Sequence, residues 1–130
     1  MMPNENQSAD ELLEVIDWAM LNGLREFQAE GEPDLIQELV GLFKRETPSQ
    51  IEAIRAAITA GDAERLRKAA HSLKGSSANL GVRLVSALGA ELEKKGRSGA
   101  VEGAGALLAQ LEREYARACR ALDAEPRGPA

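Results

Sequence analysis

Cysteine, aromatic residues and long hydrophobic runs are scarce in this chain of 130 residues. The one cysteine, Cys119, has no second cysteine to pair with, which excludes an internal disulfide and fits a reducing cytoplasm. Aromatic residues make up only 3% of the sequence, so Ala and Leu supply most of the core, which favours close helix packing. No stretch is long or apolar enough to span a bilayer, and the polar residues 1–10 lack the apolar segment of a signal peptide.

Basic residues are also fewer than acidic residues. The sequence has 16 Lys and Arg against 21 Asp and Glu, a formal net charge of −5, which argues against a general binder of nucleic acid or anionic membranes. Hydrophobic residues make up 44%, enough for the core of a single domain. Residues 1–13 and 125–130 are polar or rich in Pro and Gly, so we expect flexible ends around one domain at 14–124.

Between these ends the apolar residues recur at helical spacing, with no convincing alternation typical of a strand. Asp17 is a good N-cap for a short first helix. We expect one long, kinked helix to follow, with Pro33 in its first turn, because the apolar stripe stays in phase across Pro48. Gly61 should end that helix and Asp62 should cap the next.

The same spacing predicts a third helix over about residues 63–79 and a fourth that ends in basic residues followed by Gly96. Residues 97–105 form a loop of small residues that merges into a last helix carrying Val101. Short loops between long helices indicate antiparallel neighbours. The expected fold is therefore all-α, an up-down antiparallel four-helix bundle with a short additional N-terminal helix.

The single histidine, His71, lies on the wrong side of its helix to belong to the core. At about 100° per residue it stands roughly 150° from the middle of the apolar stripe. That stripe comprises Leu66, Ala69, Ala70, Leu73, Ser77 and Leu80. An exposed imidazole with space around it and a cation beside it suits an anion, above all a phosphoryl group.

Two neighbours strengthen this interpretation of His71. Lys74 places positive charge one turn away, and Gly75 removes a side chain that would crowd the ring. A surface histidine beside a lysine is most often without function. Glycine within a helix, however, costs roughly 1 kcal/mol relative to alanine, and an exposed face gives no packing reason for that cost.

The run Ala70-His71-Ser72-Leu73-Lys74-Gly75-Ser76-Ser77, followed by Leu80-Gly81, resembles the signature of histidine phosphotransfer (HPt) domains of two-component phosphorelays. The Asp-capped first helix, a second helix rich in Leu and Phe, the pair Leu92-Glu93 and a glycine-ended fourth helix also fit that family. The resemblance covers residues 17–122.

The resemblance implies that His71 accepts a phosphoryl group from a receiver aspartyl-phosphate on Nε2 and passes it to another receiver aspartate. Lys74 matches the motif lysine, whose ammonium would balance the phosphoryl charge. Gly75 matches the glycine that lets the partner's loop approach. Ser76 is a candidate to bond a phosphoryl oxygen or, alternatively, its own helix backbone. By helical phase Ser77 points towards the core and is structural.

Relatives often place a glutamine from the next helix against the inner nitrogen of the imidazole, and Glu93 holds that position here. A carboxylate there would hold the ring and raise its basicity rather than only orient it. The alternative is a solvated Glu93 beside Lys94.

The expected docking surface comprises residues near His71 by helical phase: Arg67, Lys68, Ala78 and Asn79. With Lys74, the two basic residues make this side positive, and Glu64 is the one acid on it. Such a surface suits the acidic pocket of a receiver domain.

The implied partners are response-regulator receiver domains, including that of a hybrid histidine kinase, with no nucleic acid and no membrane. The sequence has no Gly-rich phosphate loop and no second domain for ATP, so the expected activity is that of a cytoplasmic phosphoryl carrier without kinase activity. No cofactor or metal of its own is expected, because Mg²⁺ in this system belongs to the receiver.

Two alternatives stay open at this point. One is the phosphoacceptor domain of a chemotaxis-type histidine kinase, which has a similar His-x-x-Lys-Gly motif. The start at Met and the loose tail without a long linker favour a free-standing carrier over that alternative. The other is a non-phosphorylated helical interaction module that uses the same face only for binding.

Overall fold

The computed structural model describes residues 16–26 and 34–123 of the chain. These residues form five helices and, within those ranges, no strand: α2 (Trp18–Arg25), α3 (Leu35–Ala60), α4 (Ala63–Asn79), α5 (Arg83–Arg97) and α6 (Ala104–Asp123). The all-α expectation is confirmed. The ends expected to be flexible, residues 1–13 and 125–130, lie outside the described residues.

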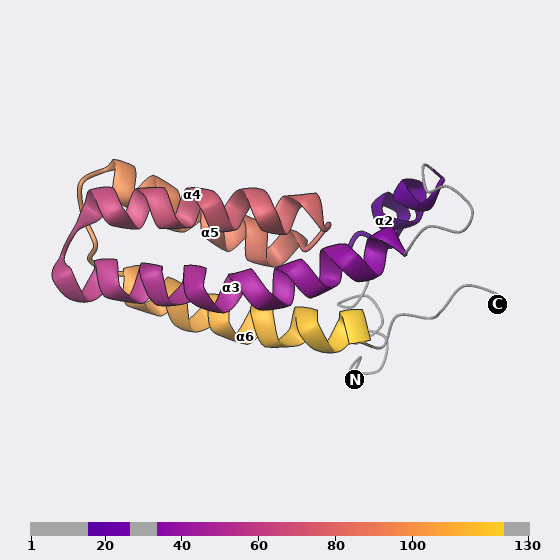
Figure 1. Ribbon diagram of the computed structural model, residues 1–130. Coiled ribbons are helices and arrows are strands. Elements are labelled where there is room, and N and C mark those ends of the chain that lie inside the picture. The colour runs from indigo at the N-terminus through magenta and orange to yellow at the C-terminus, as the bar shows by residue number, and fades with distance from the viewer. Residues whose placement is uncertain (1–15, 27–33, 124–130) are drawn as a thin grey trace, which may run out of the picture.

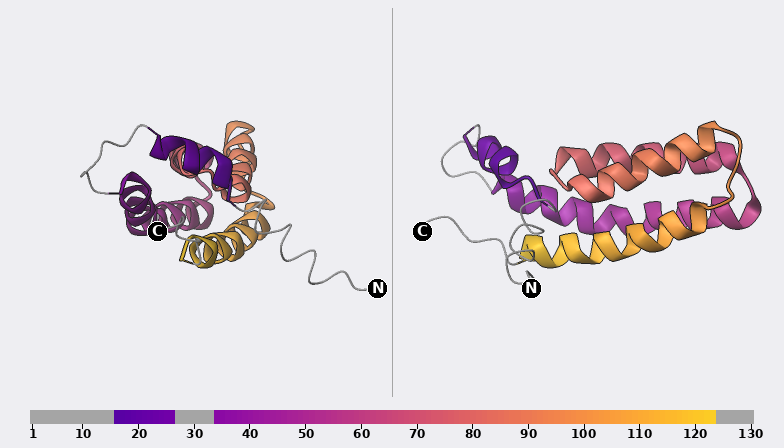
Figure 2. Two further views of the ribbon diagram at one scale, coloured as in Figure 1. Left: turned by 90° about the vertical axis from the view of Figure 1, so that its right-hand side faces the viewer. Right: turned by 180° about the vertical axis from the view of Figure 1, so that it is seen from behind.

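The four long helices form two layers. Figure 1 shows α4 and α5 side by side in one layer and α3 and α6 in the other, and the view from behind agrees. The short α2 crosses one end of the bundle (Figure 2). It is fastened there by an isolated antiparallel bridge between Ile16 and Val82 and by the Asp17 amide, which donates to the Gly81 carbonyl at 2.8 Å. Among the described residues the core between the layers is Leu, Ile, Val and Ala together with Phe43, as the composition predicts.

Aspartate side chains begin three of the helices. Asp17 accepts from the Met20 amide at 3.0 Å, and Asp62 accepts from the Arg65 amide at 3.1 Å, both as expected. Asp34 caps α3 through the Ile36 amide at 2.9 Å. The helix therefore begins at Leu35, and Pro33 lies outside the described residues.

One continuous helix passes through Pro48, as the unbroken apolar stripe predicts. Proline has no amide hydrogen, so it cannot donate to the Lys44 carbonyl one turn before it. The Tyr115 hydroxyl, from α6, donates to that carbonyl at 3.4 Å. Burial, together with a hydrogen bond to Cys119, raises the pKa of Tyr115. α6 thus supplies part of what the proline removes.

The expected end of the fourth helix at Gly96 is wrong. α5 continues through Gly96 to Arg97, and Gly96 is buried where α5 crosses the first turns of α4. A Cβ at Gly96 would lie 2.6 Å from the Arg67 amide nitrogen and 2.7 Å from the Ala63 carbonyl oxygen, both backbone atoms. This glycine permits close helix packing instead of ending a helix.

The last helix also begins later than expected. Val101 lies in the loop before α6, partly buried against the core, and Ala104 is the first helical residue. The loop turns at Gly99 and Gly103, whose φ values are +85° and +82°. In the described ranges, no helix is long and apolar enough to cross a membrane.

Candidate functional site

His71 projects from the outer face of α4. Its side chain is 64% exposed, whereas its neighbours Ala70 and Leu73 are fully buried. The sequence therefore placed the ring correctly, away from the core. The helix holds the Cα in position, but an exposed imidazole on a single helix can still rotate, so something else must fix its orientation.

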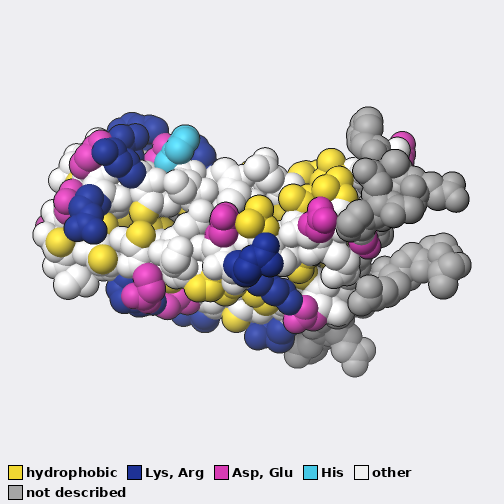
Figure 3. Space-filling view, viewed as in Figure 1, with side chains coloured by type: hydrophobic (Ala, Val, Ile, Leu, Met, Phe, Trp, Pro, Cys, Tyr) yellow, Lys and Arg dark blue, Asp and Glu magenta, His cyan; other side chains and the backbone are white. Residues whose placement is uncertain are grey.

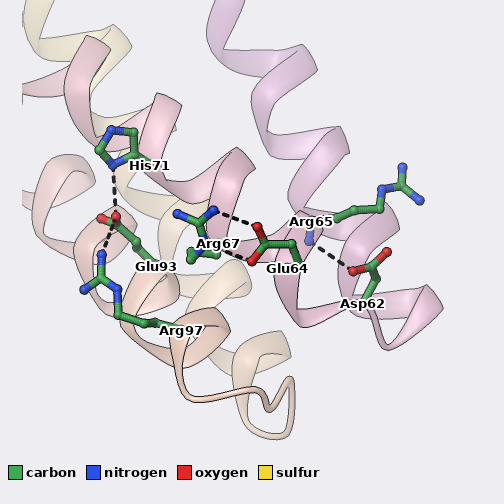
Figure 4. A network of polar contacts seen from close by, with 7 residues as sticks. All are labelled: Asp62, Glu64, Arg65, Arg67, His71, Glu93 and Arg97. Carbon is green, nitrogen blue, oxygen red and sulfur yellow. Dashed lines mark hydrogen bonds and ion pairs between the residues drawn. The ribbon is translucent and has the colours of Figure 1, made fainter.

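Glu93 fixes it. The carboxylate comes from α5, its side chain is only 4% exposed, and its Oε2 lies 2.9 Å from His71 Nδ1. Figure 4 shows the ring standing on this carboxylate, with the other nitrogen pointing away from it. Of the two interpretations of Glu93, the solvated side chain is thus excluded and the inner contact is present.

Two further cations share the same carboxylate. Lys74 Nζ lies 2.7 Å from Oε1, and Arg97 Nη2 lies 2.9 Å from Oε2, the oxygen that also contacts His71. The hydrogen bonds from Lys74 and, next, from His71 lower the pKa of Glu93 from its ordinary 4.5 to about 2, against the opposing effect of burial. Glu93 is therefore a carboxylate at every physiological pH.

The charge of Glu93 determines the form of the ring. An ionised carboxylate only accepts hydrogen bonds, so the nitrogen facing it, Nδ1, must carry the proton. In the neutral ring the lone pair then belongs to Nε2, the nitrogen turned towards solvent. The site therefore presents an oriented nucleophile of the kind that attacks phosphorus.

Two glycines shape the surface near His71. A Cβ at Gly89 of α5 would lie 3.2 Å from the Lys74 Cα, so the two helices approach closely beneath the site. A Cβ at Gly75, in contrast, would meet nothing within 4 Å. The absence of a side chain at Gly75 leaves open space on the same face of α4 as His71, which suits an approaching partner.

The two serines of the motif point elsewhere. Ser76 Oγ donates to the Leu73 carbonyl of its own helix at 3.2 Å and lies 3.3 Å from Gln50 Oε1 of α3. Of its two expected roles, the bond to the helix backbone is the one present. Ser77 is fully buried, as expected from its helical phase.

The four residues expected to dock a partner all belong to α4, two of them before His71 in the helix and two after it. Lys68, Ala78 and Asn79 are exposed, and Arg67 is half-buried. Arg67 is held by Glu64 through two hydrogen bonds, of 2.9 and 2.7 Å. Figure 3 shows basic side chains gathered around the histidine.

Beyond the basic cluster lie two hollows, each lined by apolar and polar side chains. Ala78 borders a shallow hollow of about 330 Å³ between α2, α4 and α5, which Met20, Ala87 and Ala90 also line. Asn79 borders a different groove of about 70 Å³, against Leu42 and Phe43 of α3. Ala78 and Asn79 therefore face different neighbours.

Arg97 is the site residue that the sequence interpretation missed, because it was assigned to a loop. The spacing of four residues from Glu93 on one helix was the available signal, since such pairs lie on the same face. In the part of the chain that the structure describes, no group of three or more His, Cys, Asp or Glu side chains is arranged to hold a metal.

An antiparallel bundle with one oriented histidine facing solvent suits a protein that carries a chemical group on an imidazole. The sequence matches the Hpt domain family over residues 38–121. The structure is similar to the crystal structure of histidine-containing phosphotransfer protein B (HptB) from Pseudomonas aeruginosa PAO1. That match has a TM-score of 0.76 and 34% sequence identity, and it covers 85% of this chain and 93% of that chain. The comparison with curated proteins found no match.

The chain belongs to the Hpt domain family. It is a histidine phosphotransfer protein of phosphorelay signalling, and proteins of this family work with receiver domains and histidine kinases.

Proposed function

We propose that His71 is the phosphoacceptor and that Nε2 is the reacting atom. The contact between Nδ1 and the ionised Glu93 carries this proposal, because it leaves the lone pair on the exposed nitrogen. The protein then relays a phosphoryl group between aspartates of different receiver domains.

The transfer proceeds by direct displacement at phosphorus. The Nε2 lone pair forms the N–P bond while the bond between phosphorus and the receiver's aspartate oxygen breaks, and the aspartate leaves as a carboxylate. The phosphorylated ring keeps its Nδ1 proton and is cationic. Glu93 stabilises that charge from below. The reverse displacement by a second receiver aspartate restores the neutral ring.

Lys74 supplies positive charge beside the transferring group. Its ammonium lies on Glu93 at 2.7 Å, about a third of its side chain is exposed, and a rotation of its flexible stem brings it to a phosphoryl oxygen. Gly75 gives the partner's active-site loop room to approach. Ser76 is assigned to the helix backbone and not to the phosphoryl group.

We propose that receiver domains dock on the surface around His71. Arg67 and Lys68 attract the acidic pocket of the receiver, and Ala78 and Asn79 extend the contact along α4. The receiver brings the Mg²⁺, so the carrier needs no cofactor of its own and has no kinase activity. In this proposal a hybrid histidine kinase is among the phosphate donors.

The cytoplasm is the proposed compartment, because Cys119 is a free thiol and the partner kinases and regulators act there. A chemotaxis-type phosphoacceptor domain and a non-phosphorylated scaffold are both disfavoured by the family match and the likeness to HptB.

The test is phosphotransfer from a panel of receiver domains, each phosphorylated beforehand with a small-molecule phosphodonor. We expect acid-labile, base-stable phosphate on the wild-type chain and none on His71→Gln, with both proteins equally helical by circular dichroism. Labelling that persists in His71→Gln would refute the assignment.

A further inference from the structure

Glu93 is paired with more positive charge than is needed to orient the ring of His71. One hydrogen bond from Nδ1 fixes the imidazole, yet Lys74 and Arg97 bind the same carboxylate. The proposed function gives roles to His71, Lys74 and Glu93 but leaves Arg97 without one.

The two cations occupy different oxygens. Lys74 lies alone on Oε1, whereas Arg97 shares Oε2 with the imidazole. Figure 4 shows Glu93 between His71 and Arg97, with the guanidinium on the side away from the ring. Lys74 can therefore leave Oε1 without disturbing Oε2, and Arg97 stays near Glu93 because both belong to α5, four residues apart.

Loss of every full cation from Glu93 would be costly. Its side chain is 4% exposed, and a buried carboxylate without a charged partner is strongly unfavourable. A dianionic phosphoryl group on Nε2 attracts the Lys74 ammonium away from Oε1. If Lys74 were the only cationic side chain there, this movement would leave Glu93 with the cationic phosphorylated ring as its one charged partner, and with none when the phosphoryl group leaves and the ring becomes neutral.

We propose that Arg97 is a positioning residue, which keeps Glu93 paired beneath the imidazole while Lys74 turns to the phosphoryl group. This inference rests on the proposed function. It adds a residue that never touches the phosphoryl group but sets the charge of the groups that do.

The charged groups around the ring come from the two helices that form this face. α4 supplies Lys74, the exposed Lys68 and Arg67, which is held by Glu64, and α5 supplies Glu93 and Arg97. The test therefore uses variants that remove one positive charge each, so that a change in total charge is separated from a change at Glu93.

The single histidine makes the measurement direct, because one imidazole gives one set of ¹⁵N resonances. Lys74→Gln mimics the departure of the ammonium in the unphosphorylated protein. We expect the titration midpoint of the ring to lie about one pH unit higher in Lys74→Gln/Arg97→Gln than in Lys74→Gln, because the ring must then supply the missing charge. In Lys74→Gln/Arg97→Lys the titration midpoint of the ring should return most of the way to its value in Lys74→Gln.

Arg83→Gln is the matched control in the Lys74→Gln background. Arg83 is exposed on the same helix, 14 residues and about 21 Å from Arg97 along the axis, and its removal should leave the midpoint within a few tenths of a unit. Equal midpoints in Lys74→Gln and Lys74→Gln/Arg97→Gln would overturn the role of Arg97.

A second measurement uses potassium phosphoramidate as phosphodonor. Arg97→Gln should be phosphorylated several-fold more slowly than wild type at neutral pH, with the difference closing as the pH is raised. A deficit independent of pH would mean that Arg97 is merely structural. Failure of the wild-type chain to form phosphohistidine would instead refute the proposed function, and the titration series would still decide on Arg97.

Discussion

The exposed histidine and the buried carboxylate beneath it depend on each other. Glu93 is tolerated in the interior because His71, Lys74 and Arg97 surround it, and His71 has one reactive nitrogen because Glu93 occupies the other. The sequence suggested this pair only through the family resemblance, since 22 residues separate the two and no helical periodicity links them. The structure supplies the close crossing of α4 and α5 that brings them together.

The charge of Glu93 makes part of the stability depend on pH. Its pKa is lower in the folded protein, about 2 against 4.5, so its contribution is complete above pH 4.5 and lost as the pH falls towards 2. We expect the difference in unfolding free energy between wild type and Glu93→Gln to shrink across that window. Urea unfolding at neutral pH, pH 4.5 and pH 3 measures it, and a difference that stays constant would contradict the assigned ionisation.

Gly75 separates stability from function at one position. A methyl group there meets nothing, so Gly75→Ala should stabilise the fold by about 1 kcal/mol through helix propensity. The same methyl group should slow transfer from a receiver, because it occupies space that the partner needs. Thermal unfolding and transfer rates test both effects, and a faster or unchanged transfer rate would show that the space at Gly75 is not used.

At the scale of elements, the pairing of α4 with α5 positions the site. Most helix boundaries could be predicted because local signals mark them, such as the Asp62 cap and the left-handed Gly61. Gly96 misled the prediction because a glycine after basic residues is typical of a helix end. Its actual role is contact with the α4 backbone, which depends on tertiary packing. The support that Tyr115 gives at Pro48 was hidden for the same reason.

Gly96→Ala tests that packing. Helix propensity alone favours alanine, but the added Cβ would lie within 3 Å of backbone atoms of Ala63 and Arg67, which no side-chain rotation relieves. We expect a net loss of roughly 1–3 kcal/mol in unfolding free energy. A displaced α5 should also weaken the contact between His71 and Glu93. Gly75→Ala is the matched control, and equal stabilisation in both variants would contradict the close crossing.

For the whole molecule, charge is unevenly distributed. The chain is acidic, with a net charge of −5, yet Lys and Arg side chains surround the histidine. The composition argues against a general nucleic-acid binder, and the basic residues that helical phase placed near His71 do gather around it in the folded protein. The net charge of the chain predicts repulsion of an acidic partner, whereas the basic side chains around His71 predict attraction.

This polarity predicts that association with a receiver weakens as salt is added, because exposed charges are screened beyond about 8–10 Å at moderate ionic strength. Lys68→Gln should lower the association rate and flatten the salt dependence. Arg120→Gln, which removes an exposed charge from α6 in the other layer, should change neither. Stopped-flow association at two salt concentrations distinguishes these outcomes, and identical slopes for all three proteins would contradict docking at the basic surface.

The most direct measurement is the nitrogen to which phosphorus becomes attached. With one histidine in the chain, ¹⁵N and ³¹P spectra of the phosphorylated protein report a single ring. The structure predicts an N–P coupling to Nε2, together with a proton retained on Nδ1 against Glu93. Phosphorus on Nδ1, or on any residue other than His71, would contradict it.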